Sequence, residues 1–341
     1  MILKHLKQQM LLPIEEYIIN ERVHIRGRDV LILSFTVDKE KNRLWIIYEE
    51  KSCPINEIDC EYREKIKTNR EEKLHSIEEH SRHKEFYIKQ IEIQGQIVNF
   101  SSSRNSHINN SNLEEIMQLQ HFIEKGLIPE EWDDINLENL VIAQYEQMEE
   151  EITPSIDKTK ELDIKLYINQ SFIEKPIQHC FKVDFGKQNI GTKIVYYDKE
   201  LGRESCFFIN EIYSFDIYED IKEKAEKIED REIRDKNLNI FMEGLKNVCP
   251  RGKNLAVIKY ETVDNIQLNF YIKDYLEATP IYSNSSIGII GRTNKNEIGI
   301  NGYRLRECVL QPIDKDFSGE LEIELFSQFL EIPEESVKSI R

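Results

Sequence analysis

The stretch from Leu74 to His83 is the densest group of titratable side chains in the sequence. If it is helical, His75, Glu79 and His83 lie on one face, because each is four residues from the next. Imidazole and carboxylate groups at that spacing are suitable ligands for a transition metal, which makes the stripe a candidate for a metal-assisted hydrolase. The simpler interpretation is a solvated helix face, since Glu, Lys and Arg surround these residues.

A loop that carries Arg251 and Lys253 is the second candidate. The sequence Cys249-Pro-Arg-Gly-Lys253 follows an expected helix, and a glycine-containing loop with two cations can hold an anion. If these cations lower the pKa of the Cys249 thiol, that group becomes a thiolate. The alternative is an ordinary helix end, where basic residues, proline and glycine are common.

The third candidate is the Gly- and Asn-rich stretch 283–302, which contains Arg292 and is followed by Arg304 and Arg306. Loops with arginine nearby often form the rims of binding sites, so these three arginines are candidates for holding an anion or another ligand. Plain hairpin turns have the same composition and are the alternative.

Motifs of common enzyme classes do not occur in the sequence: it has no phosphate-binding P-loop, dinucleotide fingerprint, zinc-protease motif or serine-hydrolase elbow. The six cysteines form no C-x-x-C pair, so neither a zinc ribbon nor a redox pair is predicted. We therefore expect no cofactor, and the prediction is a non-catalytic binding protein of unknown ligand, with the metal-assisted hydrolase as the alternative.

The expected strands and helices that would position these residues do not alternate regularly along the chain. Their order therefore predicts an α+β fold of antiparallel hairpins and sheets with flanking helices. In the first half we expect hairpins from Val30–Val37 with Leu44–Glu49 and from 86–93 with 96–101. A polar loop over 101–112 and a helix over about 137–150 are expected to follow.

In the second half the apolar spacing predicts strands over 180–185, 193–197 and 204–209 and one long helix over 217–245. A hairpin of 255–262 with 266–273 follows, and a short helix over 334–339 ends the pattern. The best linker candidate is 153–159, which divides the chain into an N-terminal subdomain, 1–152, and a C-terminal subdomain, 153–341.

The net charge of -17 argues against a broad contact with nucleic acid or with an anionic membrane surface. The charge is concentrated, because residues 111–151 hold twelve acids and one base, and residues 313–335 hold eight acids and one base. The segments Glu114–Glu151 and Asp314–Glu335 are therefore predicted to bind a basic protein, with a solvated surface as the alternative.

The segment Cys249–Glu261 with Gln267–Ile272 resembles uncharacterised proteins of clostridia and related Firmicutes, over about the last hundred residues of the chain. This resemblance implies a bacterial, cytoplasmic protein and assigns no activity. The sequence also shows no signal peptide and no apolar run long enough for a membrane span, which agrees with a cytoplasmic location.

Overall fold

The computed structural model describes residues 2–38, 41–50, 66–82, 85–109, 111–149, 151–157, 159–160, 162–186, 190–281 and 297–338. Antiparallel strands dominate this part of the chain and helices flank them, so the predicted α+β class is confirmed. No helix in these residues is both long and apolar enough to cross a membrane.

The chain divides into two compact units, each built from segments that are separate in the sequence. Unit 1 comprises Met1–Tyr62, Arg82–Phe172 and Glu331–Arg341, and unit 2 comprises Arg63–Ser81 and Ile173–Leu330. The linear division into 1–152 and 153–341 is a different partition and stays a prediction.

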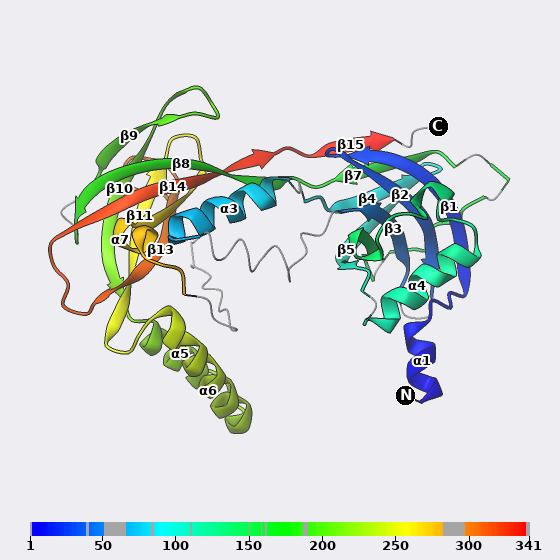
Figure 1. Ribbon diagram of the computed structural model, residues 1–341, viewed down its shortest axis with the longest axis horizontal. Coiled ribbons are helices and arrows are strands. Elements are labelled where there is room, and N and C mark those ends of the chain that lie inside the picture. The colour runs from blue at the N-terminus through cyan, green and yellow to red at the C-terminus, as the bar shows by residue number, and fades with distance from the viewer. Residues whose placement is uncertain are drawn as a thin grey trace. The chain divides into compact units, whose positions relative to one another are not determined.

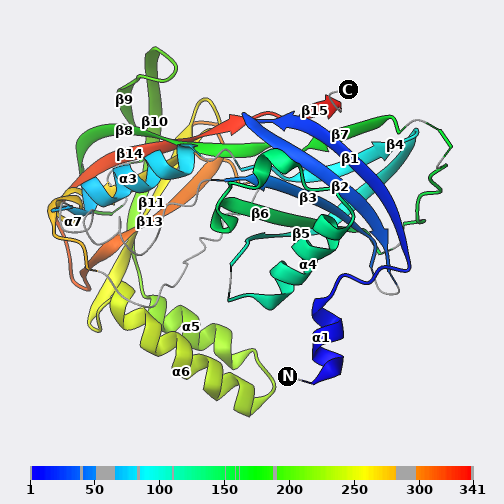
Figure 2. The same ribbon diagram turned by 45° about the vertical axis from the view of Figure 1, so that its right-hand side comes forward.

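Unit 1 is organised around an antiparallel sheet that curves strongly (Figures 1 and 2). Within the described residues its strands lie in the order β1 (Glu15–Ile25), β2 (Arg28–Val37), β3 (Arg43–Glu49), β6 (Leu140–Gln147), β5 (Gln96–His107), β4 (Ile88–Ile93), β7 (Ile164–Ile168) and β15 (Glu335–Lys338).

The two faces of this sheet bury different cores, because side chains alternate along a strand. In β3, Leu44 and Ile46 belong to a core on the concave side, whereas Trp45 and Ile47 point to the opposite face. Helix α4 (Leu113–Glu124) covers that second face with Leu119 and Phe122, and α1 (Leu3–Gln9) lies beside α4 (Figure 2).

Both turn residues that join β1 to β2, Arg26 and Gly27, have positive φ values, 51° and 89°, as a tight hairpin requires. The Arg26 side chain is only 3% exposed and donates hydrogen bonds to the carbonyl oxygens of Glu85 and Asn169, both at 2.7 Å. Its Nε atom lies 3.4 Å from the Glu335 carboxylate of β15. One guanidinium therefore connects the first and the last strand of the curved sheet.

Three elements of unit 1 differ from the sequence-based expectations. The stretch expected to be a helix over 137–150 is strand β6, preceded by two 3-10 turns, Glu130–Trp132 and Leu137–Asn139. A central strand is buried on both faces, so its apolar run has no alternation to distinguish it from a buried helix. The expected helix over 334–339 is strand β15, which pairs with β7, and the expected loop after residue 101 continues as β5.

Unit 2 contains two sheets that face each other. In the described residues, one sheet has the order β13 (Leu305–Asp314), β11 (Lys253–Thr262), β10 (Arg203–Phe215) and β9 (Thr192–Asp198), and the other has β12 (Gln267–Ile272), β14 (Glu320–Ile332) and β8 (Ser171–Asp184). Aromatic side chains fill the core between them, with Phe207, Tyr260 and Phe270 in ring contact.

The strands expected to pair as a hairpin, β11 and β12, belong to different sheets. The Tyr260 hydroxyl donates to the Leu268 carbonyl at 3.0 Å and accepts from the Leu268 amide at 2.9 Å. A side chain in the core thus occupies main-chain groups that a hairpin partner would otherwise pair.

Among its described residues, unit 2 has the helices α3 (Asn69–Arg82), α5 (Ile217–Glu226), α6 (Arg231–Val248) and α7 (Lys273–Glu277). The expected single helix over 217–245 is an antiparallel pair, α5 and α6 (Figure 1). The Asp230 carboxylate caps α6 by accepting from the amide of Ile233, so the chain restarts a helix at this point rather than continuing one.

We predict that Arg26→Met destabilises unit 1 by about 2–4 kcal/mol, because it leaves two carbonyl oxygens without their donor and the Glu335 carboxylate without its cation. Urea unfolding followed by tryptophan fluorescence measures this effect, since both tryptophans, Trp45 and Trp132, lie in unit 1. Arg22→Met is the matched control, because its exposed ion pair with Glu131 is expected to contribute less than about 1 kcal/mol. Equal stability of the two variants would contradict the role of Arg26.

Candidate functional site

The predicted metal site is described only in part. His75 and Glu79 lie one turn apart on α3, with His75 Nε2 3.2 Å from a Glu79 oxygen, whereas His83 lies outside the described residues. The described residues contain no group of three metal-ligating side chains. The three-residue metal site therefore stays a prediction.

The loop with Arg251 and Lys253 has the features of a helix end. The Cys249 side chain is fully buried after α6, and burial raises the pKa of its thiol, with the Asp216 charge acting in the same direction. Lys253 lies 3.5 Å from the Asp314 carboxylate on the neighbouring strand. The environment thus favours a neutral thiol over a thiolate.

The five predicted anion-binding residues do not form one site. In the register of β11 and β13, Lys253 lies opposite Asp314 at one end, and Arg306 lies opposite Tyr260 toward the other end. Residues 253 and 260 are separated by roughly 23 Å at about 3.3 Å per strand residue. Arg304 and Arg306 lie next to each other, Arg251 belongs to the distant end, and Arg292 lies outside the described residues.

Nine of the twenty acidic residues in the two acidic segments form ion pairs with basic residues from elsewhere in the chain, within the part that the structure describes. Their ion pairs in the described residues are Glu114–Arg104, Glu131–Arg22, Glu146–Lys41, Asp314–Lys253, Glu320–Lys182, Glu322–Lys273, Glu324–Arg70, Glu334–Lys89 and Glu335–Arg26. Binding of a basic protein through Glu114–Glu151 and Asp314–Glu335 stays a prediction, and part of their negative charge is compensated within the chain, mostly in Asp314–Glu335.

The feature of unit 1 that offers unused binding groups is the second half of β5. Residues 101–107 read Ser-Ser-Ser-Arg-Asn-Ser-His, and all except Ser106 are exposed. This stretch pairs with β6 along its whole length, from Ser102 opposite Glu146 to His107 opposite Val141. Strand β4, in contrast, pairs with β5 only as far as Asn99.

The backbone of β5 therefore has an open edge over these residues. The Ile108 amide donates to the Leu140 carbonyl at 2.9 Å, which shows that residue 108 faces β6. Because alternate residues of an antiparallel strand face opposite edges, the amide and carbonyl groups of Ser103, Asn105 and His107 point away from β6. No residue in the described part of the chain pairs with those three backbone positions.

The open edge begins where β4 leaves the sheet. There the Tyr87 hydroxyl donates to the Phe100 carbonyl at 3.1 Å, and Ser101 forms a bulge in the pairing of β5 with β6. A bulge twists the strand locally, which separates the paired first half of β5 from its exposed second half.

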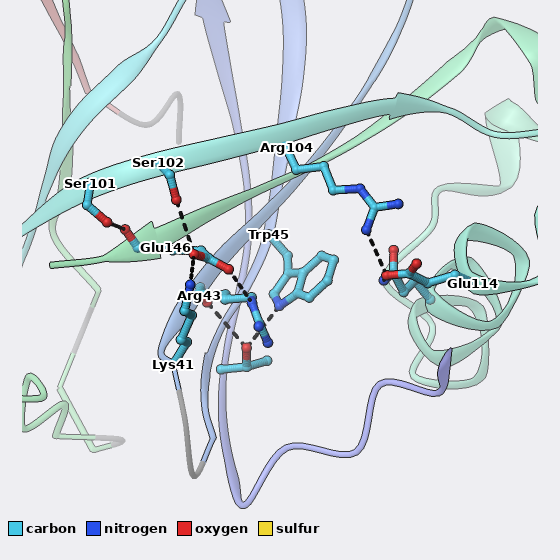
Figure 3. Close-up of polar contacts among 10 residues, drawn as sticks. Lys41, Arg43, Trp45, Ser101, Ser102, Arg104, Glu114 and Glu146 are labelled. Carbon is cyan, nitrogen blue, oxygen red and sulfur yellow. Dashed lines mark hydrogen bonds and ion pairs between the residues drawn. The ribbon is translucent and has the colours of Figure 1, made fainter. Parts of the chain in front are cut away.

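A cluster of polar side chains links the exposed half of β5 to β6 and to the start of β3 (Figure 3). The Glu146 carboxylate of β6 lies 2.5 Å from Lys41 Nζ, accepts from the Ser102 hydroxyl at 3.1 Å and lies 3.5 Å from Arg43 Nε. Burial raises the pKa of Glu146, but the hydrogen bonds from Lys41 and Ser102 outweigh it and hold the pKa below its ordinary value. Glu146 therefore stays ionised and joins β5 to the start of β3.

Arg104 extends from the same face of β5 toward helix α4 (Figure 3), where its guanidinium lies 3.0 Å from a Glu114 oxygen. The Arg104 side chain remains 52% exposed, so one side of the guanidinium is accessible to a further partner. On the other face, the Nδ1 atom of His107 lies 3.0 Å from the Glu138 carbonyl. The strand thus presents an ordered row of hydrogen-bonding groups.

Sequence reasoning missed this element because a run of Ser, Asn and Arg is typical of loops. One signal was available: no Gly or Pro interrupts the chain between Gln96 and Asn112. A polar strand of this kind is stable only because β6, about forty residues later in the chain, supplies its backbone partners.

Comparison of the chain with protein-family models, with curated proteins and with solved structures finds no match. The resemblance to clostridial proteins accordingly stays a prediction.

We predict a period of two in amide exchange along β5. The amides of Arg104, Ser106 and Ile108, which face β6, are expected to exchange at least about a hundredfold more slowly than those of Ser103, Asn105 and His107. Hydrogen exchange followed by NMR at single-residue resolution measures this difference. Uniform protection along residues 103–108 would show that the outer edge is already paired.

Proposed function

We propose that the chain is a non-catalytic binding protein that receives an extended peptide of a partner protein as an additional strand beside β5. The observation that carries this proposal is the row of backbone groups of Ser103, Asn105 and His107 on the edge opposite β6. An unpaired strand edge is a template for a further strand, and main-chain hydrogen bonds provide much of the affinity in such complexes.

The geometry fits a short segment of the partner. Alternate residues of a strand are about 6.8 Å apart, so the three open positions offer main-chain groups to a peptide of about six residues. An extended peptide presents its own amides and carbonyls with the same spacing, whereas a helix has no free main-chain groups to offer. The edge therefore selects an extended partner.

The side chains of β5 indicate the chemistry of the partner. Ser103, Asn105 and His107 lie on one face and favour small polar side chains opposite them, while Arg104 on the other face favours a carboxylate. A second copy of this chain fits less well, because antiparallel self-pairing about Arg104 would bring two arginines close together. A polar, acidic segment of another protein is the occupant that we infer.

Selection from a library of displayed random decapeptides tests this proposal. We expect extended binders, and N-methylation of the selected peptide at alternate residues should weaken binding at least about tenfold, which corresponds to about 1.4 kcal/mol. The intervening positions, which face away from β5, should tolerate the methyl group. Affinities are measured by fluorescence polarisation with labelled peptide.

Two variants of the protein complete this test. Asn105→Pro removes an outward amide without touching the bonds to β6, and it is expected to abolish binding, whereas Asn105→Gln keeps the amide and should bind like the wild type. Failure to select any peptide, binding without the period of two, or dimerisation of the chain through this edge would each overturn the proposal.

A metal-assisted hydrolase is the alternative, and the ion pair of His75 with Glu79 is the observation that favours it. Elemental analysis of protein purified without chelators distinguishes the two functions. For a non-catalytic binding protein we expect zinc, manganese and iron well below one equivalent. An equimolar metal that is lost in His75→Ala and kept in the matched variant His80→Ala would replace our proposal with the alternative.

A further inference from the structure

Two arginines of unit 2 lie side by side and form no ion pair with an acidic residue in the described part of the chain. Arg304 forms an isolated bridge with Ile298 directly before β13, and Arg306 is the second residue of that strand. Residues two apart on an extended chain point to the same side, so the two guanidinium groups share one face of β13. On this face the neighbouring strand contributes Tyr260, which is fully buried.

Within the residues that the structure describes, the hydrogen bonds of this pair go only to uncharged groups. Arg306 Nη2 donates to the main-chain and side-chain oxygens of Asn265, at 2.6 and 2.7 Å. The Nε atoms of both Arg304 and Arg306 are buried and have no hydrogen-bond partner in the described part of the chain. Each guanidinium therefore keeps unused donors in a place that bulk water does not reach freely.

The carboxylates of Glu307, Glu261 and Asp264 have other partners. Glu307 lies 3.6 Å from Lys259 Nζ and accepts from the Tyr213 hydroxyl at 3.1 Å. Glu261 is fully buried and accepts from the amides of Asn301 and Tyr303. Asp264 is likewise paired, with Arg203 at 2.9 Å.

This arrangement is unusual for the chain, because its sequence has 63 acidic residues and only 46 basic ones. Arg22, Arg28, Arg70, Arg104 and Arg203 each form an ion pair, whereas neither Arg304 nor Arg306 does so among the described residues. Burial lowers the pKa of Arg306 and the neighbouring Arg304 charge adds to this effect. Two like charges held together without compensation are stabilised when an anion binds between them.

We propose that Arg304 and Arg306 together bind a phosphate group, either free or as a monoester. A phosphate dianion balances two guanidinium charges, and its oxygens match the planar fork of arginine donors better than a halide does. The site would hold its ligand by charge-assisted hydrogen bonds and would carry out no chemistry on it. It is independent of the peptide edge of β5, which belongs to unit 1.

Isothermal titration calorimetry on the full chain tests this site, with inorganic phosphate and glycerol 3-phosphate as probes and sodium chloride holding the ionic strength constant. We expect one equivalent to bind with a Kd of about 1 mM or below. Arg304→Gln and Arg306→Gln should each weaken binding at least about tenfold. Arg231→Gln, which removes an exposed arginine of α6 that is paired with Asp235, is the matched control and should bind like the wild type.

The two probes distinguish the source of the phosphate, since tighter binding of glycerol 3-phosphate identifies a monoester and tighter binding of inorganic phosphate identifies the free ion. A wild-type measurement covers the case in which a variant does not fold: the side-chain Nε resonances of Arg304 and Arg306 should shift on titration with phosphate. An adventitious response, equal for phosphate, acetate and chloride, or the absence of any shift at these two arginines, would overturn the proposal.

Discussion

The central position of β6 is the constraint on which unit 1 depends. This strand pairs with β3 on one edge and with β5 on the other, and so joins the strands that precede it in the sheet to those that follow. Its side chains enter both cores, with Ala143 and Tyr145 on the concave side and Ile142 under helix α4. Without β6, the polar half of β5 would have no backbone partner at either edge among the residues that the structure describes.

Local patterns in the sequence were sufficient where the partner strand is close in the chain. The predicted hairpin of 30–37 with 44–49 is confirmed as β2 and β3, and the turn at Gly95, with a φ of 76°, is found between β4 and β5. In both cases the strands show β-branched and aromatic residues around a turn, and the pairing partner lies only a few residues away.

Prediction failed where the secondary structure depends on distant residues. The run Leu140–Gln147 has helical spacing as well as strand-forming residues, and only burial between β3 and β5 decides for the strand. The secondary structure of β15 also depends on a distant residue pairing, because its partner β7 is far away in the sequence. Of the predicted sites, the adjacency of Arg304 and Arg306 could be derived from strand alternation, but the lack of an ion pair with any acid that the structure describes could not.

The chain order of the two units has a consequence for synthesis. Strand β15 closes the sheet of unit 1, yet it follows every residue of unit 2 in the chain. A ribosome must therefore translate all of unit 2 before Glu335 can reach the Arg26 guanidinium, which is made among the first residues of unit 1. Until then the edge of β7 that pairs with β15 lacks that strand, and an unpaired edge of this kind is open to pairing with another chain during synthesis.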